Sequence, residues 1–183
     1  MKIGLAQINS TVGSIIENSS KIVEYINNYS SHCDIMVFPE LVLTGYPPQD
    51  LLLESRFIEL AKNELIKISE KVMDCIVLIG TIRKIEQDLF NSVAILSPFN
   101  EIEFRDKTLL PTYDVFEEDR YFTASKNINP VEISVNGELI KLGIHICEDL
   151  WNQENDIDVV GELAKKNADI FINLSDNSAI CHI

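Results

Sequence analysis

Two different spacings of apolar residues alternate along this chain, and this alternation limits the folds open to it. Some segments repeat apolar residues with the period of an amphipathic helix, whereas others are short apolar runs typical of buried strands. The helical segments cover about 14–29, 55–72 and 156–167, and the apolar runs cover 2–9, 34–39, 75–80 and 168–174. Strands that alternate with helices predict an α/β domain with helices packed on a sheet.

Two predicted hairpins modify this pattern. Residues 89–97 and 101–107 are strand candidates joined by a turn at 98–100, and residues 130–135 and 138–146 flank Asn136-Gly137. An Asn-Gly pair between two apolar runs is a strong hairpin signal. We therefore expect about eight strands in mixed sheets, and no linker or repeat divides the chain into domains.

The composition excludes some partners. Apolar residues make up 46% of 183 residues, enough for a sizeable core, and 15 basic against 29 acidic residues give a net charge of −14. This charge argues against nucleic acid and anionic membranes, because both bind basic surfaces. The polar start MKIGLAQINS and the lack of 18 consecutive apolar residues predict a cytoplasmic chain without a spanning helix. None of the four cysteines forms a CxxC pair, so we expect reduced thiols.

Three reactive side chains stand where a predicted strand ends and a loop begins. Glu40 ends VFPE, Lys107 lies in RDKTLLP, and Cys147 follows the apolar strand of LGIHICEDLW. Open α/β sheets place their sites at such positions. A carboxylate there suits a general base, an ammonium can stabilise an oxyanion, and a thiol can be a nucleophile. Each residue taken alone also fits a surface or packing role.

Two other readings of the Cys147 segment are possible. His145 and Cys147 share one face of a strand, so they could form a Cys–His pair, although adjacent positions rarely aim at one substrate atom. We therefore interpret His145 as a packing residue. Asp149 and the acidic cluster at 154–158 suggest a metal, but their spacing matches no ligand set.

Together, the Glu40, Lys107 and Cys147 segments resemble the nitrilase superfamily, whose members use a Glu–Lys–Cys triad in this order. Three stretches are similar to the amidase domain of glutamine-dependent NAD synthetases: GYPPQDLLL (45–53), KTLLPTYDVFEEDRYF (107–122) and ICEDLW (146–151). The resemblance runs from Met1 to about Leu174. It implies a nitrilase-like αββα sandwich with mixed sheets, in a carbon–nitrogen hydrolase domain over 1–183 whose C-terminal part is missing.

The resemblance also implies catalytic roles. Cys147 would attack the side-chain amide of glutamine, and Glu40 would accept the thiol proton and later protonate the leaving ammonia. Lys107, with the backbone N–H of Glu148, would hold the tetrahedral oxyanion. Glu118 would orient Lys107 or the hydrolytic water. A neighbouring ammonium is also expected to lower the thiol pKa.

The same resemblance supplies the remaining expectations. Tyr113 and Phe116 would shape the glutamine pocket, and Glu148 and Ser175 would hold the α-amino and carboxylate groups. The amidase reaction needs no cofactor, whereas ATP and Mg²⁺ belong to the absent synthetase domain. The partners would be glutamine, a synthetase domain or chain that accepts ammonia for NAD synthesis, and further copies in a homo-oligomer. The alternatives are a stand-alone amidase or carbamoyl hydrolase, or a truncated, inactive module.

Overall fold

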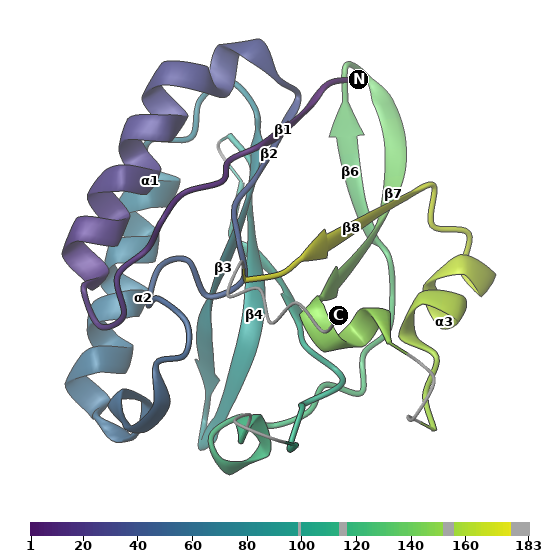
Figure 1. The fold of residues 1–183 in the computed structure, drawn as a ribbon. Coiled ribbons are helices and arrows are strands. Elements are labelled where there is room, and N and C mark those ends of the chain that lie inside the picture. The colour runs from purple at the N-terminus through teal and green to yellow at the C-terminus, as the bar shows by residue number, and fades with distance from the viewer. Residues whose placement is uncertain (99, 114–116, 152–155, 177–183) are drawn as a thin grey trace, which may run out of the picture.

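The computed structural model describes residues 1–98, 100–113, 117–151 and 156–176, and arranges them in four layers (Figure 1). Two helices cover one sheet, a second sheet packs on the other face of the first, and a short helix lies beyond the second sheet. This arrangement confirms the predicted αββα sandwich with mixed sheets.

The first sheet has the order β1-β2-β3-β4-β5. Strands β1, β2 and β3 run parallel, and β4 and β5 continue the sheet antiparallel. The parallel half comes from two β-α-β units, and the antiparallel half comes from consecutive hairpins. The strands are β1 (Ile3–Leu5), β2 (Ile35–Val37), β3 (Ile76–Ile85), β4 (Asp88–Leu96) and β5 (Glu103–Asp106).

The second sheet has the order β6-β7-β8, with β6 (Val131–Val135), β7 (Glu138–Ile146) and β8 (Ile170–Leu174). The predicted hairpin at Asn136-Gly137 is confirmed, because β6 and β7 pair antiparallel around it. Both turn residues have positive φ angles, 52° and 84°, as a two-residue hairpin of this hand requires. Strand β8 pairs parallel to β7 after the short helix α3 (Val159–Lys165).

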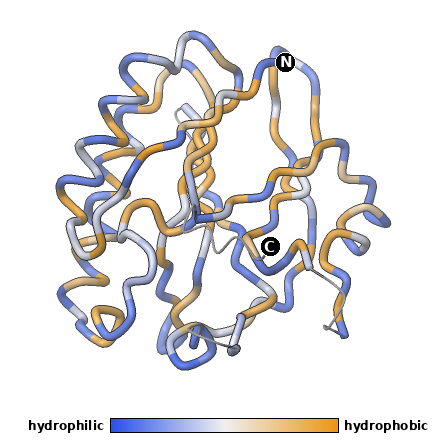
Figure 2. The backbone as a smooth tube through the Cα atoms, in the orientation of Figure 1, coloured by the Kyte–Doolittle hydropathy of each residue, from blue (hydrophilic) through white to orange (hydrophobic). Residues whose placement is uncertain are grey.

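Helices α1 (Ile15–Tyr29) and α2 (Ser55–Ser69) bury one apolar stripe each against the first sheet. The stripes recur at helical spacing, as predicted: Ile15, Ile22 and Ile26 in α1, and Ala61, Leu65 and Ile68 in α2. The opposite face of this sheet packs on the second sheet. This core comprises Leu78, Val93 and Ile95 from the first sheet and Leu142, Ile144 and Ile172 from the second. Figure 2 shows the resulting concentration of hydrophobic residues along the central strands.

The main correction concerns β3, which was expected to end near residue 80. It continues to Ile85 and forms a long hairpin with β4. The apolar run stops early because the strand end leaves the core, and polar side chains replace apolar ones there. Arg83 bonds to Asp106 on β5 at 3.0 Å and lies over the ring of Phe104, so cross-strand contacts hold this end. Strand β1 is shorter than the predicted 2–9.

Short 3-10 helices, which the apolar pattern does not predict, occupy several loops. They are η1 (Ser30–His32), η2 (Gln49–Leu53), η3 (Glu118–Arg120) and η4 (Cys147–Leu150). Two of them, η3 and η4, carry candidate site residues. In the described ranges, no helix is long and apolar enough to cross a membrane.

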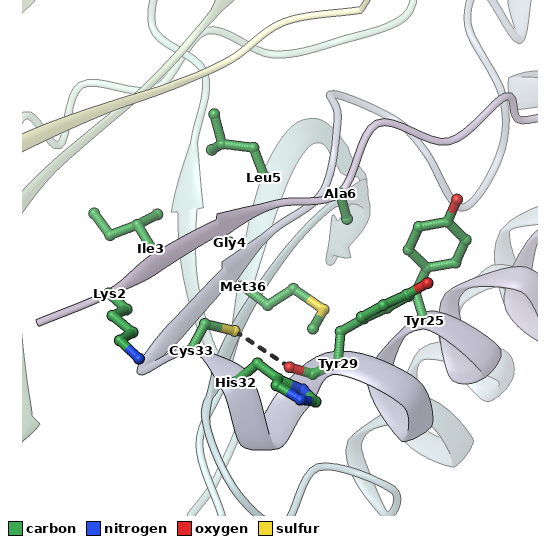
Figure 3. A pocket seen from close by; sticks show the side chains of 10 residues that line it. All are labelled: Lys2, Ile3, Gly4, Leu5, Ala6, Tyr25, Tyr29, His32, Cys33 and Met36. Carbon is green, nitrogen blue, oxygen red and sulfur yellow. Dashed lines mark hydrogen bonds between the residues drawn. The ribbon is translucent and has the colours of Figure 1, made fainter.

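Strand β1 forms an open edge of the first sheet, and a hollow of about 600 Å³ lies beside it (Figure 3). Ile3, Tyr25, Tyr29 and Met36 are among the residues that line it, and the Leu5 side chain on β1 is 76% exposed. Glu40, Lys107 and Cys147 do not line this hollow.

Gly80 on β3 lies against the backbone that follows β2. A Cβ at this position would stand 2.2 Å from Pro39 O, 2.4 Å from Leu41 N and 2.6 Å from the carbonyl carbon of Glu40. Backbone cannot yield like the end of a flexible side chain. We therefore expect Gly80→Ala to lower the free energy of unfolding by about 1–3 kcal/mol in denaturant titrations.

Gly4→Ala provides a matched control on the same sheet. Its Cβ would meet only side-chain atoms of Cys33 closer than 3.9 Å, the nearest at 3.2 Å. The expected change is about 1 kcal/mol or less. Equal destabilisation by the two substitutions would contradict the close backbone approach at Gly80.

Candidate active site

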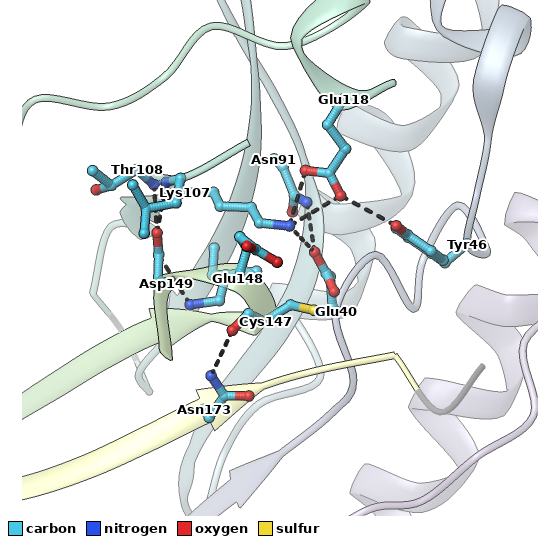
Figure 4. A network of polar contacts seen from close by, with 12 residues as sticks. Glu40, Tyr46, Asn91, Lys107, Thr108, Glu118, Cys147, Glu148, Asp149 and Asn173 are labelled. Carbon is cyan, nitrogen blue, oxygen red and sulfur yellow. Dashed lines mark hydrogen bonds and ion pairs between the residues drawn. The ribbon is translucent and has the colours of Figure 1, made fainter. Parts of the chain in front are cut away.

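The ends of three strands bring Glu40, Lys107 and Cys147 together (Figure 4). Glu40 lies three residues after β2, Lys107 directly follows β5, and Cys147 directly follows β7. The N–H of Lys107 still donates to Asn91 O at 2.8 Å, so the pairing of β5 with β4 fixes its position. The three side chains thus meet between the two sheets, and each follows a strand, at the strand-to-loop positions that the sequence indicated.

The ammonium of Lys107 lies buried between two carboxylates. Its Nζ donates to Glu40 Oε1 at 2.8 Å and to the two oxygens of Glu118 at 3.0 and 2.9 Å. Burial alone would lower the pKa of Lys107, but the charges of Glu40 and Glu118 outweigh it and raise this pKa. Lys107 therefore stays protonated as a fixed positive charge.

The two oxygens of Glu40 differ in their contacts. Oε1 accepts hydrogen bonds from Lys107 Nζ and from Asn91 Nδ2, each at 2.8 Å. Oε2 is buried and has no partner among the described residues. One oxygen is therefore held in place, and the other is free to accept a proton.

Glu118 lies in η3 and is buried beside Lys107. Tyr46 OH donates to its Oε1 at 3.3 Å, so the carboxylate is held from two sides. Burial raises the pKa of Glu118, with Lys107 opposing and Glu40 adding to the increase. Its bonds reach the ammonium directly, which favours a role in orienting Lys107.

Cys147 begins η4 with a φ angle of 42°, a left-handed conformation that is uncommon for residues other than glycine. Burial and the nearby charge of Glu40 raise the pKa of its thiol to about 11, and Lys107 only partly opposes this. Lys107 lowers the thiol pKa, as expected, but burial and the charge of Glu40 outweigh this effect. At neutral pH the thiol therefore carries its proton, and a nucleophilic role would need a base to remove it.

The residues expected to contact substrate lie near the thiol where the structure describes them. Tyr113 OH donates to Glu148 Oε2 at 2.8 Å, and burial and Glu148 raise the pKa of Tyr113 to about 12. The Ser175 side chain lies close enough to the Cys147 thiol to lower the thiol pKa. Phe116 lies outside the described residues.

The contacts of His145 and Asp149 do not support a Cys–His pair or a metal site. His145 is buried, its Nδ1 lies 3.1 Å from Gly143 O, and burial lowers its pKa, as expected for a packing residue. Asp149 accepts hydrogen bonds from backbone N–H groups on both sides of the site. Among the described residues, no cluster of His, Cys, Asp or Glu could hold a metal ion.

The sequence reasoning missed Asn91 and Tyr46, which hold Glu40 and Glu118 respectively. Asn91 had a detectable signal, because it is a polar residue inside the apolar run at 89–97. Tyr46 lies in the loop segment GYPPQD and carried no such signal, because only the fold brings it to a residue 72 positions later.

Comparisons with known proteins identify the family of this chain. The family model described as carbon-nitrogen hydrolase matches residues 2–181. A glutamine-dependent NAD(+) synthetase from Synechocystis is 37% identical over 195 aligned positions, which cover 98% of this chain and 34% of that protein. A glutamine-dependent NAD(+) synthetase from Aquifex aeolicus is 37% identical over 178 positions, which cover 96% of this chain and 30% of that protein. The chain thus spans about a third of the length of these relatives.

Solved structures show the same fold. A glutamine-dependent NAD+ synthetase from Acinetobacter baumannii matches with a TM-score of 0.81 and 30% identity, over 96% of this chain and 32% of that one. An amidase from Nesterenkonia matches with a TM-score of 0.76 and 18% identity, over 96% of this chain and 64% of that one. At this identity the match supports the fold alone. Because the family model covers nearly every residue, this chain belongs to the carbon–nitrogen hydrolase family.

Proposed function

We propose that this chain hydrolyses the side-chain amide of glutamine, with Cys147 as nucleophile, Glu40 as general base and acid, and Lys107 as oxyanion stabiliser. The observation that carries the proposal is the buried Oε2 of Glu40, which has no partner among the described residues. A second observation is the ammonium fixed beside it at 2.8 Å from Oε1. The similarity to glutamine-dependent NAD synthetases supports glutamine as substrate.

The first half of the reaction forms a thioester. Cys147 Sγ attacks the amide carbon while its proton passes to Glu40 Oε2. The carbonyl oxygen becomes an oxyanion that Lys107 Nζ and the N–H of Glu148 stabilise. The first N–H groups of a helix such as η4 have no partner within that helix, so this N–H is suited to the task. Glu40 then protonates the amide nitrogen, and ammonia leaves.

The second half releases glutamate. A water molecule attacks the thioester carbon while Glu40 accepts its proton. The second tetrahedral intermediate collapses, the C–S bond breaks, and Glu40 returns the proton to the thiolate. Splitting amide hydrolysis into two steps avoids direct attack of water on a poor electrophile. Both steps of glutamine hydrolysis use only side chains, backbone and water, so we propose that the reaction needs no cofactor.

The residues expected to contact the substrate complete the proposed site. Tyr113 with Glu148 would shape the pocket, and Glu148 is suited to hold the α-amino group because its carboxylate is anchored by Tyr113 OH at 2.8 Å. Ser175 would contact the glutamine carboxylate. Phe116 is kept as a pocket residue from the family resemblance alone. Glu118 would keep Lys107 in place, through bonds of 2.9 and 3.0 Å.

The wider context stays a prediction. Within a longer protein or a complex, the ammonia would amidate nicotinic acid adenine dinucleotide on a synthetase domain that uses ATP and Mg²⁺. A cytoplasmic location and a homo-oligomer belong to the same proposal. The open edge of β1, with its exposed Leu5 side chain, is a surface that favours association.

A substrate panel tests the proposal. The chain should release ammonia from glutamine faster than from simple aliphatic amides or N-carbamoyl compounds. Intact-mass analysis should also show one adduct with a glutamine-analogue electrophile, which peptide mapping places on Cys147. A preference for aliphatic amides would instead favour a stand-alone amidase. A folded sample with neither turnover nor adduct would contradict the glutaminase and favour an inactive module.

Lys107→Ala should abolish measurable glutamine turnover. Loss of an oxyanion donor costs about 2.7–4 kcal/mol of transition-state stabilisation, a rate loss of about 10²–10³-fold. The change also leaves Glu40 and Glu118 buried together without their cation, so the free energy of unfolding should fall by about 3–5 kcal/mol. Steady-state ammonia release and denaturant titration measure the two effects.

Lys141→Ala is the matched control for this change. Lys141 forms an exposed ion pair with Glu132 at 3.6 Å, so its removal should leave turnover unchanged and stability within about 1 kcal/mol. Normal turnover in folded Lys107→Ala would rule out the proposed triad.

Glu40→Gln should separate thiol reactivity from catalysis. Because the charge of Glu40 contributes to the raised pKa of Cys147, about 11, its removal should lower this pKa. More thiolate would then exist at pH 8, and alkylation of Cys147 by iodoacetamide should become faster. Glutamine turnover should nevertheless fall by about 10²–10⁴-fold, because the base is gone.

The alkylation rate is followed at Cys147 itself by peptide mass mapping. Glu64→Gln is the control, because Glu64 is also a buried carboxylate but bonds to Ser19 and Lys67, outside the site. Glu64→Gln should change neither rate. Slower alkylation of Cys147 in Glu40→Gln would show that Glu40 does not set the thiol pKa.

A further inference from the structure

The buried carboxylate of Asp149 joins two backbone segments that belong to different sheets (Figure 4). Its Oδ1 accepts hydrogen bonds from Thr108 N at 3.0 Å and Leu109 N at 2.7 Å. Its Oδ2 accepts one from Ile146 N at 3.1 Å. The first segment follows β5 of the first sheet, and the second ends β7 of the second sheet.

Each of these segments carries a reacting group. Thr108 and Leu109 directly follow Lys107, and Ile146 directly precedes Cys147. The carboxylate therefore bridges the backbone of the proposed oxyanion stabiliser and the backbone of the proposed nucleophile. Apolar packing between the two sheets keeps them apart. Hydrogen bonds, which have a preferred length and direction, restrict the distance between these two backbone segments more narrowly.

We propose that Asp149 is a positioning residue that fixes the separation and relative orientation of the Lys107 ammonium and the Cys147 thiol. This inference rests on the proposed function and deepens it. Asp149 itself touches neither the substrate nor the reacting atoms. It acts through the two backbone segments that it holds.

The chemistry of the contacts explains why a carboxylate stands here. All three partners are N–H donors, and an ionised carboxylate offers only acceptors. An Asn side chain could keep one acceptor oxygen, but its NH₂ group would then face a donor. Burial raises the pKa of Asp149, and the backbone donors and the charge of Arg105 oppose this rise. Arg105 is itself buried, only 3% exposed, so a positive charge is fixed near the carboxylate.

Asp149→Asn is the variant that tests this role. Mispairing at either oxygen should displace one segment by a fraction of an ångström while the core stays intact. Small misplacements of reacting groups can cost up to about 100-fold in rate. We expect the kcat for glutamine hydrolysis to fall by about 10–100-fold with KM changed less than about threefold, because the substrate pocket is retained. Ammonia release is measured well below the melting temperature.

A second readout does not require glutaminase activity. Without the hydrogen bond from Ile146 N, η4 is held less firmly and the buried thiol becomes more accessible. Alkylation of Cys147 by iodoacetamide, followed by peptide mapping, should become at least about threefold faster. The buried thiol of Cys75 lies outside the site and serves as the internal reference, so its rate should not change.

Ile133→Ala is the control for general destabilisation. Ile133 lies in the core between the sheets, on β6 rather than on a strand that leads into the site. It should lower the melting temperature without changing kcat or the Cys147 alkylation rate in the folded protein. The positioning role is supported when only Asp149→Asn shows both changes.

Two results would overturn the inference. One is folded Asp149→Asn with normal kcat and normal Cys147 alkylation. The other is Ile133→Ala with the same two changes at equal stability, which would reduce Asp149 to a general structural contact. Lack of glutamine hydrolysis by the parent chain would refute the proposed function instead, and the Cys147 alkylation ratio would then decide on the positioning role alone.

Discussion

The contact of one buried ammonium with two buried carboxylates is the interaction on which the site depends. Burying any one charge of the cluster formed by Lys107, Glu40 and Glu118 without a partner would cost several kcal/mol. Removing Lys107 would therefore leave two carboxylates buried without a counter-charge. The cluster is therefore a constraint on the fold. It requires that the segments after β2 and β5, together with η3, bring their side chains to one point beside the thiol.

The architecture meets this constraint because strand ends from both sheets converge. The antiparallel pairing of β4 with β5 places Asn91 and Lys107 side by side, and both bond to the same oxygen of Glu40. The backbone around Glu40 rests on Gly80, where no side chain separates the two segments. Cys147 follows a strand of the second sheet, so packing between the sheets brings its thiol close to Glu40.

Local pattern was sufficient to predict most α-helices and strands and the residues at the strand ends, but not the 3-10 helices or the contacts between elements. The Asn136-Gly137 hairpin and the apolar faces of α1 and α2 depend on residues that are close in sequence, so the sequence predicts them. The end of β3 was missed because long-range partners, rather than apolar residues, stabilise it. The net thiol pKa could not be predicted from the sequence, because it depends on burial and on the charge of Glu40, which only the three-dimensional structure reveals.

The proposed chemistry follows from how charge would move around Lys107. Before attack, the negative charge nearest the thiol is on Glu40, and the thiol is neutral because its pKa is raised to about 11. When the thiol proton moves to Glu40, the negative charge moves to the new oxyanion. It stays beside the same ammonium throughout, so no charge has to be created or separated in the buried site. Glu118 bonds to Lys107 at 2.9 and 3.0 Å and would keep the ammonium in place during this transfer, which is how a second carboxylate would be useful. With Glu118 absent, protonation of Glu40 would remove the last anchor of the ammonium just as the oxyanion forms.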